Sequence, residues 1–463
     1  MKIFRRKAEP TANDHQFSSA QRSPGKMRIC IVVEVFLPKR DGVTLTVERV
    51  INFLHQQKHE VLILAPGESI PSICGYEVVP AAGFPLRFYP GLRYNIFGYN
   101  LTKKLLDFKP DVIQLFDPIM LGLQAFYFCK FFMPRTPMIY TYCTNIPMYT
   151  KIFGYPQLSH MQWGMLKIEH ESSKVTMVPS QSVKDDLVNR GFGGQIIRWP
   201  RPVDAERFHP KKKRDDLRAL WTGSELGKDA IPSDKIILLF VSRISWEKGL
   251  NTLRNAYEGL DHSRFHLVVV GDGPARQEFE PDFLPGEVSF VGWRGGEELA
   301  EAYASADIFL FASLTETFGN VLLEAAASGL PIVACDAMGV KDLVIHGKTG
   351  FLTPPLDADA MRNSILTIAN DPQLKQRMGL EGRAFAETYT WKFSFDIAME
   401  AYRTAMQKGK EPITPFPVRV WDMLRLWFLN NAMIIIGLLL TAYRLVRFGR
   451  ARPIPARDFE YKF

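Results

Sequence analysis

The stretch Ala312-Ser-Leu-Thr-Glu316-Thr-Phe-Gly-Asn-Val-Leu-Leu-Glu324 joins a short loop to the start of a helix. The apolar run Ile308 to Phe311 directly before it predicts a buried strand, and the helix-forming run Asn320 to Ala327 overlaps its end. Glu316 lies in the loop and Glu324 in the helix. Carboxylates accept hydrogen bonds from sugar hydroxyls, while the free N–H groups at a helix N-terminus face sugar or phosphate oxygens. The pattern therefore suits a sugar nucleotide.

Two basic residues and a glycine-containing loop stand upstream of this stretch. Lys235 to Ser242 predicts another buried strand, and Arg243 and Lys248 follow its carboxyl end. The run His266 to Pro274 repeats the arrangement, with two glycines after the strand. Ligands of open parallel sheets bind beyond the carboxyl ends of the strands, so these loops should converge on one crevice. There the two cations would neutralise a diphosphate. Two solvated surface charges are the alternative.

Five sequence blocks in this order resemble the retaining glycosyltransferases of family 4, which have the GT-B fold. The blocks are Ser242-Arg243-x4-Lys248-Gly249, Gly271-Asp-Gly-Pro274, Tyr303-Ala-Ser-Ala-Asp307, Glu316-x7-Glu324 and Ser328-Gly-Leu-Pro331. The resemblance extends over residues 27–408 and is strongest over 235–355. Within the family, the run Tyr140-x4-Asn145-Ile-Pro-Met-Tyr149 looks closest to the sulfoquinovosyl-diacylglycerol synthases. The chain is also similar to the phosphatidylinositol mannosyltransferases.

The resemblance implies an α/β chain with two Rossmann-like domains that face a central cleft. It also implies front-face attack, in which the leaving phosphate takes the proton of the incoming hydroxyl. On this resemblance Arg243 and Lys248 stabilise the departing nucleotide diphosphate, and Glu316 holds hydroxyls of the donor sugar. Further donor-binding positions are implied at Gly42, Gly271, Gly273, Val291, Phe318, Gly319, Asn320, Val321 and Glu324, of which Glu324 would take the ribose hydroxyls.

The acceptor side departs from the family pattern at one residue. The family usually has histidine in a Tyr-His-Thr pattern after the Met138–Tyr142 strand, whereas this chain has Cys143, followed by Thr144 and Asn145. A thiol cannot supply the two-nitrogen hydrogen bonding of imidazole. Cys143 is a tolerated substitution, marks a different donor or acceptor, or signals low activity; the sequence leaves the three readings open.

The resemblance implies a hexosyltransferase that moves a sugar from a nucleotide diphosphate to a membrane lipid such as diacylglycerol. A UDP-sugar, such as UDP-sulfoquinovose or UDP-glucose, is the favoured donor. One alternative is a GDP-mannose-dependent mannosyltransferase that acts on a lipid or glycan. Another is a glycosyltransferase-like subunit that catalyses nothing. Glycoside hydrolysis, the usual chemistry of paired carboxylates, fits poorly with the accompanying Arg, Lys and phosphate-type loops.

Composition and charge restrict the partners. The chain has 463 residues, of which 46% are hydrophobic, and a formal net charge of +8. This excess suits a nucleotide diphosphate or an anionic membrane surface. Without a recognition motif, nucleic acid is not an expected partner. Five scattered cysteines favour reduced thiols, and therefore catalytic domains that face the cytosol.

The sequence predicts no metal or organic cofactor, since the nucleotide sugar is a substrate. The nine histidines form no ligand pair, and the cysteines form no CxxC motif. Asp357-Ala-Asp359 imitates a metal-binding carboxylate pair, but it follows two prolines far from the phosphate loops. It is interpreted as a surface helix start.

Alternating strands and helices predict two mainly parallel sheets. The expected boundaries, in residue numbers, are a disordered tail 1–26, an acceptor domain 27–206, a linker 207–234, a nucleotide-sugar domain 235–390, a helix 391–410 that crosses back to the first domain, and a membrane segment with a basic tail 411–463.

Three segments carry membrane signals. Leu424 to Tyr443 is mostly apolar and long enough for a bilayer, and arginines flank it. Because a single span would carry the downstream arginines across the membrane, an interfacial or re-entrant anchor is the alternative. Phe84 to Lys109 and Tyr127 to Phe132 mix aromatic and basic residues, which favours either the headgroup level of a bilayer or ordinary core packing.

Overall fold

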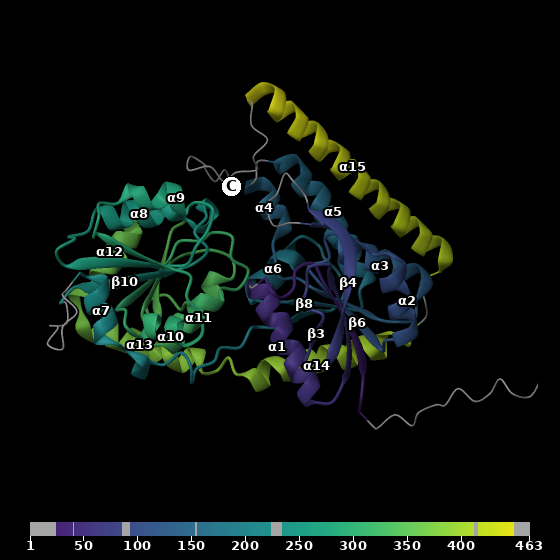
Figure 1. Cartoon of the computed structure of the whole chain (residues 1–463), viewed down its shortest axis with the longest axis horizontal. Coiled ribbons are helices and arrows are strands. Elements are labelled where there is room, and N and C mark those ends of the chain that lie inside the picture. Colours follow the sequence, from purple (N-terminus) through teal and green to yellow (C-terminus); the bar gives the residue numbers. More distant parts are fainter. Residues whose placement is uncertain are drawn as a thin grey trace, which may run out of the picture.

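A computed structural model gives the fold of the chain. It describes residues 25–39, 41–85, 93–152, 155–223, 234–411 and 415–448. Figure 1 shows two α/β halves side by side, with one long helix lying along the N-terminal half. The expected tail therefore lies almost wholly outside the described residues.

The N-terminal half contains a sheet whose strands run in the order β3-β4-β2-β1-β6-β7-β8-β9, with β5 paired to β4. All pairings are parallel except those of β4 with β3 and β5. The strands are β1 (Arg28–Val33), β2 (Glu60–Pro66), β3 (Ser72–Ile73), β4 (Tyr76–Pro85), β5 (Arg93–Ile96), β6 (Val112–Phe116), β7 (Met138–Thr141), β8 (Val175–Val178) and β9 (Ile196–Arg198). Its helices are α1 (Gly42–Gln56), α2 (Tyr99–Phe108), α3 (Leu121–Phe132), α4 (Ile146–Ile152), α5 (Pro156–Ser172) and α6 (Gln181–Asn189).

The C-terminal half contains a second, wholly parallel sheet in the order β12-β11-β10-β13-β14-β15. Its strands are β10 (Ile236–Val241), β11 (Phe265–Val270), β12 (Val288–Gly292), β13 (Ile308–Phe311), β14 (Ile332–Cys335) and β15 (Gly350–Thr353). The helices around it are α7 (Asp215–Trp221), α8 (Leu250–Glu258), α9 (Arg276–Phe279), α10 (Gly296–Ala304), α11 (Asn320–Ala327), α12 (Ala358–Asn370) and α13 (Pro372–Ala386). Short 3-10 turns are η1 (Pro210–Lys212), η2 (Trp246–Lys248), η3 (Glu280–Asp282) and η4 (Val340–Asp342).

Both sheets are buried on their two faces, which explains why the strands read as continuous apolar runs. In β10 and β11 alternate residues enter two different cores: Leu239 and Val268 pack on one face, and Leu238 and Leu267 on the other. The expected α/β class with two parallel-sheet halves is confirmed. Asp357 accepts a hydrogen bond from the backbone N–H of Ala360 and so caps α12, the role expected from its sequence context.

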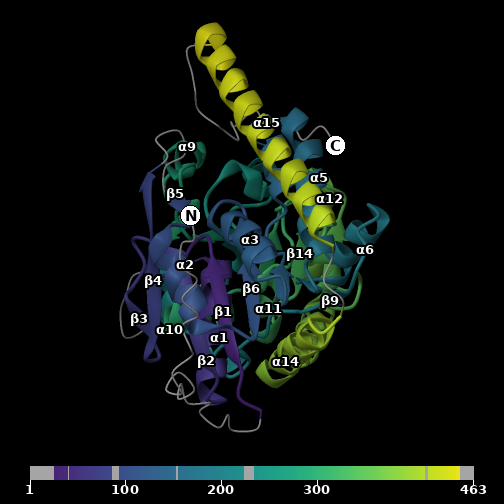
Figure 2. The same cartoon turned by 90° about the vertical axis from the view of Figure 1, so that its right-hand side faces the viewer.

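Two further helices extend along the N-terminal half. Helix α14 (Trp391–Lys408) follows α13, lies beneath the N-terminal half and packs Phe395, Ala398 and Tyr402 into the N-terminal core (Figure 1). Helix α15 (Phe416–Phe448) lies across α3 and α5, as the rotated view also shows (Figure 2).

The transmembrane interpretation of Leu424–Tyr443 is not supported. Among the helices that the structure describes, none is long and apolar enough to cross a membrane. Polar residues occur in the first half of this helix, namely Asp422, Arg425, Asn430 and Asn431. The arginines after Tyr443 lie outside the described side chains.

The aromatic segments divide between the two expected environments. Phe126 is fully buried, and Phe97 and Phe128 pack against the same core. Phe132 and Tyr99, in contrast, are exposed. Arg87, Phe88 and Tyr89 lie outside the described residues, so the aromatic–basic cluster expected there is not described.

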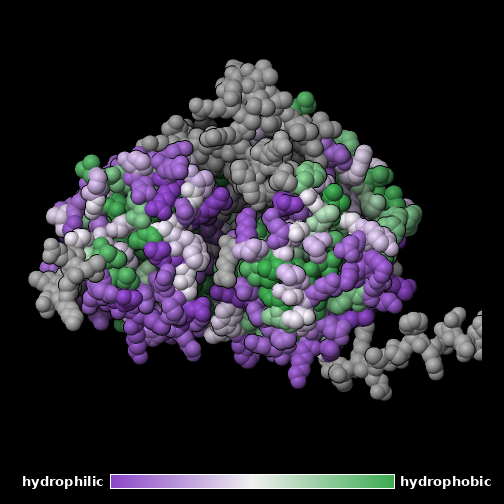
Figure 3. Space-filling view, viewed as in Figure 1, coloured by the Kyte–Doolittle hydropathy of each residue, from purple (hydrophilic) through white to green (hydrophobic). Residues whose placement is uncertain are grey.

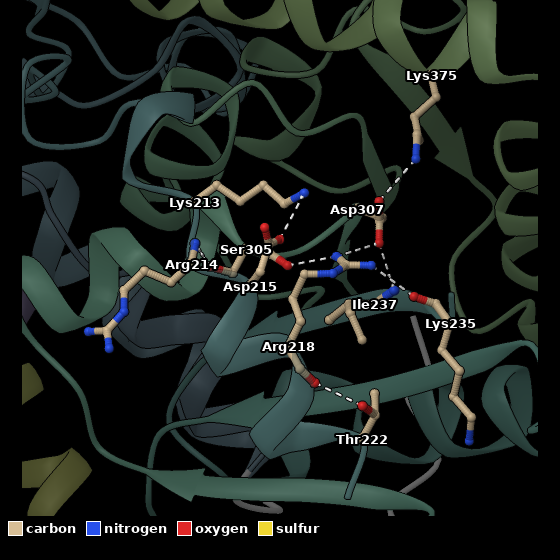
Figure 4. A network of polar contacts seen from close by, with 10 residues as sticks. All are labelled: Lys213, Arg214, Asp215, Arg218, Thr222, Lys235, Ile237, Ser305, Asp307 and Lys375. Carbon is tan, nitrogen blue, oxygen red and sulfur yellow. Dashed lines mark hydrogen bonds and ion pairs between the residues drawn. The ribbon is translucent and has the colours of Figure 1, made fainter. Parts of the chain in front are cut away.

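An ionic network around Asp307 lies at the amino ends of strands β10 and β13 in the C-terminal sheet (Figure 4). The carboxylate of Asp307 accepts from Arg218 Nη1 at 2.9 Å, from Lys375 Nζ at 3.0 Å and from the backbone N–H of Ile237 at 2.9 Å. Arg218 also donates to the carbonyls of Ser305 and Lys235. Burial opposes ionisation, but the two cations outweigh it and hold the pKa of Asp307 below its usual value. The network thus joins α7, β10 and α13 to the strand that carries the Glu316 loop.

Replacing Asp307 with Asn should destabilise the C-terminal half by about 3 kcal/mol, since it leaves Arg218 buried without a counter-charge. Urea unfolding of both proteins measures this difference. Because the pKa of Asp307 is depressed in the folded state, its contribution is fully present above the unfolded pKa and is lost as the pH falls through the folded value.

The matched control is Asp359→Asn, whose side chain is 80% exposed. This change should cost less than about 1 kcal/mol. Equal losses in the two variants, or a loss for Asp307→Asn that does not shrink in acid, would show that the network does not stabilise the sheet.

Candidate active site

The loop after β10 places Lys248 against the loop after β13. It ends in Gly249, which has a φ of 77° and begins α8. A Cβ at this position would lie 2.2 Å from the carbonyl oxygen of Ala312, so only glycine allows this approach. As a result Lys248 Nζ lies 3.3 Å from Glu316 Oε2. Two residues separated widely in sequence thus form one half-buried ion pair.

The ion pair holds its cation firmly. Burial disfavours the charge of Lys248, but Glu316, Tyr149 and Glu247 outweigh it and raise the pKa of Lys248 well above its ordinary value. Tyr149 belongs to the N-terminal half, so the Lys248 charge is felt across the boundary between the halves. Lys248 is therefore a permanent positive charge, suited to a leaving phosphate.

Arg243 supplies a second positive charge from the same loop. It directly follows Ser242 at the end of β10 and is exposed to solvent. Among the described residues no carboxylate pairs with it. Its guanidinium is thus available to an anionic ligand at the carboxyl edge of the sheet.

Gly271 and Gly273 have a structural reason for their identity. A Cβ on Gly271 would lie 1.9 Å from the carbonyl oxygen of Ser242, and one on Gly273 would lie 2.3 Å from that of Ile244. The loop after β11 therefore packs directly on the loop that carries Arg243. Val291 lies half-buried near the end of β12, one strand further from Glu316. Gly271 and Gly273 thus lie beside the loop that carries the ion pair's lysine.

The N-terminus of α11 opens beside the ion pair. Gly319 is its N-cap with a φ of 96°, and Asn320 and Val321 form its first turn. No side chain caps these N–H groups, so they stay available to ligand oxygens. Phe318, in contrast, has its side chain in the core near Tyr389. Only its backbone can serve a ligand.

Glu324 lies one turn further along α11. It accepts a hydrogen bond from Tyr303 Oη at 3.1 Å. Burial raises the pKa of Glu324, while Tyr303 and the nearby charges of Arg49 and Arg207 oppose the rise. Arg49 lies on α1, in the other half, so Glu324 also faces the boundary between the halves.

On the N-terminal side, Asp117 organises the acceptor-side residues. It follows β6 with a φ of 43°, a strained value for a residue other than glycine. Its carboxylate accepts from the backbone N–H of Cys143 at 2.6 Å and from Oγ1 of Thr144 at 2.6 Å. Burial outweighs these bonds and raises the pKa of Asp117 to about 6. Asn145 caps the next helix, since its Oδ1 accepts from the N–H of Met148.

Arg201 joins this cluster, and neither it nor Asp117 was expected from the sequence. Arg201 Nη2 donates to the sulfur of Cys143 at 3.0 Å, and the guanidinium lies 4.4 Å from the ring centroid of Trp199. The side chain is only 6% exposed, and Nη1 has no partner among the described residues. Burial and the neighbouring Asp117 raise the pKa of the Cys143 thiol to about 12, so it is neutral. The signal available in the sequence was an arginine between two prolines, three residues after the end of β9.

The two halves meet at these clusters. Thr317 Oγ1 donates to the carbonyl oxygen of Cys143, so the Glu316 loop contacts the acceptor-side loop directly. A Cβ on Gly42, at the start of α1, would lie 3.5 Å from Asn320 Nδ2. Ser182 of α6 donates from its backbone N–H and its hydroxyl to the carboxylate of Asp342, and its hydroxyl oxygen accepts from the N–H of Gly339. Figure 3 shows a furrow between the two halves on one face of the molecule.

The structure therefore brings Lys248, Glu316, Cys143, Gly42 and Asn320 to one seam. No group of three or more potential metal ligands occurs among the described residues. The seam combines the cation of Lys248, a helix N-terminus and a carboxylate, and Arg243 lies earlier in the loop that carries Lys248. These groups together suit a sugar with an anionic leaving group.

Comparison with known proteins identifies the family. The chain matches the model for glycosyl transferases group 1 over residues 224–385 and the model for glycosyltransferase family 4 over residues 40–207. It is 35% identical over 340 residues to a GDP-mannose-dependent alpha-mannosyltransferase of Corynebacterium glutamicum, which covers 72% of this chain and 78% of that protein. The chain belongs to glycosyltransferase family 4, and it is a hexosyltransferase.

Two more relatives and one solved structure are informative. A sulfoquinovosyl transferase of Arabidopsis thaliana is 29% identical over 77% of this chain and 69% of its own length. An alpha-monoglucosyldiacylglycerol synthase of Acholeplasma laidlawii is 26% identical over 70% of this chain and 84% of its own length. A sucrose-phosphate synthase from Thermosynechococcus elongatus superposes with a TM-score of 0.67 at 20% identity, over 82% of this chain and 100% of that one. The expected GT-B fold is thus confirmed.

Replacing Lys248 with Met should lower turnover of the donor about a hundredfold while leaving the fold intact. If Lys248 stabilises the leaving diphosphate, as the resemblance implies, the change removes a charge whose loss typically costs about 3 kcal/mol in the transition state. Steady-state donor hydrolysis and thermal melting measure the two effects. Lys392→Met, at an 84% exposed position on α14, is the control and should turn over normally. Normal turnover by the Lys248→Met variant would show that Lys248 does not contribute to catalysis.

Proposed function

We propose that the chain transfers a hexosyl group, with retention of configuration, from a nucleotide-diphosphate sugar to a membrane lipid. The observation that carries this proposal is the Lys248–Glu316 ion pair beside Arg243, held at a seam whose opposite wall carries Cys143. In this account the two cations stabilise the leaving diphosphate, and Glu316 binds donor hydroxyls. Glu324 takes the ribose, and the N–H groups of Asn320 and Val321 face phosphate or sugar oxygens.

The acceptor wall completes the proposed mechanism. The neutral thiol of Cys143 is a weak hydrogen-bond donor and does not act as the base. The leaving phosphate would take the proton of the incoming hydroxyl, so positioning and charge stabilisation carry the chemistry. Thr144 and Asn145 are held by Asp117 and by the start of α4, and they border the same wall. Cys143 is then a tolerated substitution within an organised site.

A lipid acceptor is supported by two observations. The Acholeplasma relative is named a diacylglycerol glucosylating synthase. In this chain, α15 exposes a row that we call the apolar face: Trp421, Leu424, Trp427 and Phe428. Such a face fits an interfacial helix that lies in the membrane plane, with Leu426 and Leu429 turned toward the protein body. We therefore propose that the chain binds peripherally to a membrane, with five free thiols in a reducing compartment.

Two donors remain candidates. A UDP-sugar, such as UDP-sulfoquinovose or UDP-glucose, is favoured by the similarity to the sulfoquinovosyl transferase and the glucosyl-lipid synthase. GDP-mannose is the second candidate, because the mannosyltransferase of Corynebacterium has the higher identity.

A transfer assay tests the proposal. Purified protein is incubated with each of UDP-glucose, UDP-sulfoquinovose and GDP-mannose, together with vesicles that contain diacylglycerol. One donor should be consumed, and its sugar should appear in the lipid phase. Hydrolysis of a donor without any glycolipid, in the presence of both diacylglycerol and phosphatidylinositol, would contradict the lipid acceptor. Failure to consume any of the three donors would contradict the donor assignment.

Changing Trp427 and Phe428 to Ser should weaken binding to phosphatidylcholine vesicles while leaving donor hydrolysis unchanged. Each large side chain moved from water to apolar surroundings contributes about 1.5 kcal/mol or more, which corresponds to about tenfold in partitioning. Vesicle flotation measures the partitioning. Leu380→Ser, at a 65% exposed position on α13, is the control. Full membrane binding by the double variant would show that the apolar face of α15 is not the membrane contact.

A further inference from the structure

A cavity of about 520 Å³ lies between α3, α5, the end of α14 and α15. Figures 1 and 2 both show α15 lying over α3 and α5. None of the active-site residues Arg243, Lys248 and Glu316 lines it. Helix α15 also lies outside both segments that match family models. The cavity is thus formed where α15, which lies outside the family segments, covers residues 129–174 of the family 4 segment.

The cavity carries an excess of positive charge. Six basic side chains line it, against three carboxylates, and each carboxylate is already paired with a lysine. The buried Lys130 binds Asp422 at 2.9 Å, so α15 is fixed to α3 by an ion pair. The three remaining cations, Arg135, Arg419 and Arg425, pair with no carboxylate among the described residues.

Arg419 is held in place as part of the cavity wall. Its Nη1 donates to the backbone carbonyls of Lys130 and Phe131, and its guanidinium lies over the ring of Phe416. Its Nε is buried and has no hydrogen-bond partner among the described residues. An anion inside the cavity would compensate the charges that no carboxylate pairs with.

The position of Arg425 connects the cavity to the apolar face of α15. Successive residues of an α-helix are rotated by about 100°. On that spacing Asp422, Leu426 and Leu429 form the side turned to the protein, where Leu426 is fully buried. Trp421 and Phe428 belong to the apolar face, and Arg425 lies between the two sides. A molecule whose anionic group binds Arg425 can thus lay attached apolar chains over Trp421 and Phe428.

We propose that this basic cavity binds the headgroup phosphate of an anionic phospholipid, whose acyl chains lie along the apolar face of α15. Charge complementarity inside the cavity and the adjacent apolar row both fit one occupant, a lipid of the bilayer surface. The inference rests on the proposed peripheral membrane binding, but it concerns a site separate from catalysis. The bound lipid would fix α15, and with it the N-terminal half, at anionic membrane.

The test compares full-length protein on vesicles of phosphatidylcholine with and without phosphatidylglycerol. Wild type should bind the anionic vesicles more tightly. The double variant Arg135→Gln, Arg425→Gln should lose about fivefold for each arginine on anionic vesicles, as for a cation at an anionic membrane surface. Its binding to phosphatidylcholine and its donor hydrolysis should stay at the wild-type level.

The control is Arg377→Gln, Arg403→Gln, which changes the net charge equally at exposed positions on α13 and α14. An equal loss in the control would overturn the site in favour of diffuse attraction. Inorganic phosphate at constant ionic strength should not displace the protein from anionic vesicles, and displacement would show a free-phosphate site instead. Dissociation of a dimer by the cavity substitutions would show that a second copy occupies the surface. If the wild-type protein hydrolyses none of the donors, the proposed function is contradicted, but the proposed lipid site is not.

Discussion

The close approach of the Gly249 loop to the end of β13 is the constraint on which the site depends. Because a Cβ at Gly249 would collide with the carbonyl of Ala312, any other residue would move Lys248 away from Glu316. The same principle places Gly271 and Gly273 against the backbone that carries Arg243. Three glycines thus bring the loops after β10, β11 and β13 together, and two cations and a carboxylate converge as a result.

The second organising feature is the boundary between the halves. Thr317 bonds across it to Cys143, whose loop is held by the strained and buried Asp117. Strain of this kind persists only where surrounding bonds enforce it, and it clusters at functional sites. Arg201 adds a buried cation with one unpaired N–H beside Cys143. The thiol of Cys143 thus has a hydrogen-bond partner within the chain, as the proposed reading of Cys143 as a tolerated substitution requires.

The sequence predicted the fold class well because both sheets are mainly parallel and are buried. Runs such as Ile236–Val241 and Phe265–Val270 are apolar throughout, and the helices between them alternate regularly. Site residues that belong to one motif could also be predicted together, since Glu316, Gly319 and Asn320 share a single strand–loop–helix unit.

Contacts between segments that are distant along the chain could not be predicted from the sequence. Asp117, Cys143 and Arg201 come from three strand ends, and no local pattern marks their association. The transmembrane interpretation of Leu424–Tyr443 is likewise not supported, since none of the helices that the structure describes is long and apolar enough to cross a membrane. Its length suggested a span, but Asp422 and Arg425 face a charged cavity, and the adjoining helix packs along α3 and α5. Which side of a helix is covered depends on the tertiary structure.

A structure of the protein with bound UDP, and a second with GDP, would test the central claim most directly. The account predicts that the diphosphate lies against Arg243 and Lys248, that Lys248 Nζ turns from Glu316 toward a phosphate oxygen, and that the ribose hydroxyls bond to Glu324. A nucleotide bound elsewhere, or a diphosphate out of reach of both cations, would contradict it.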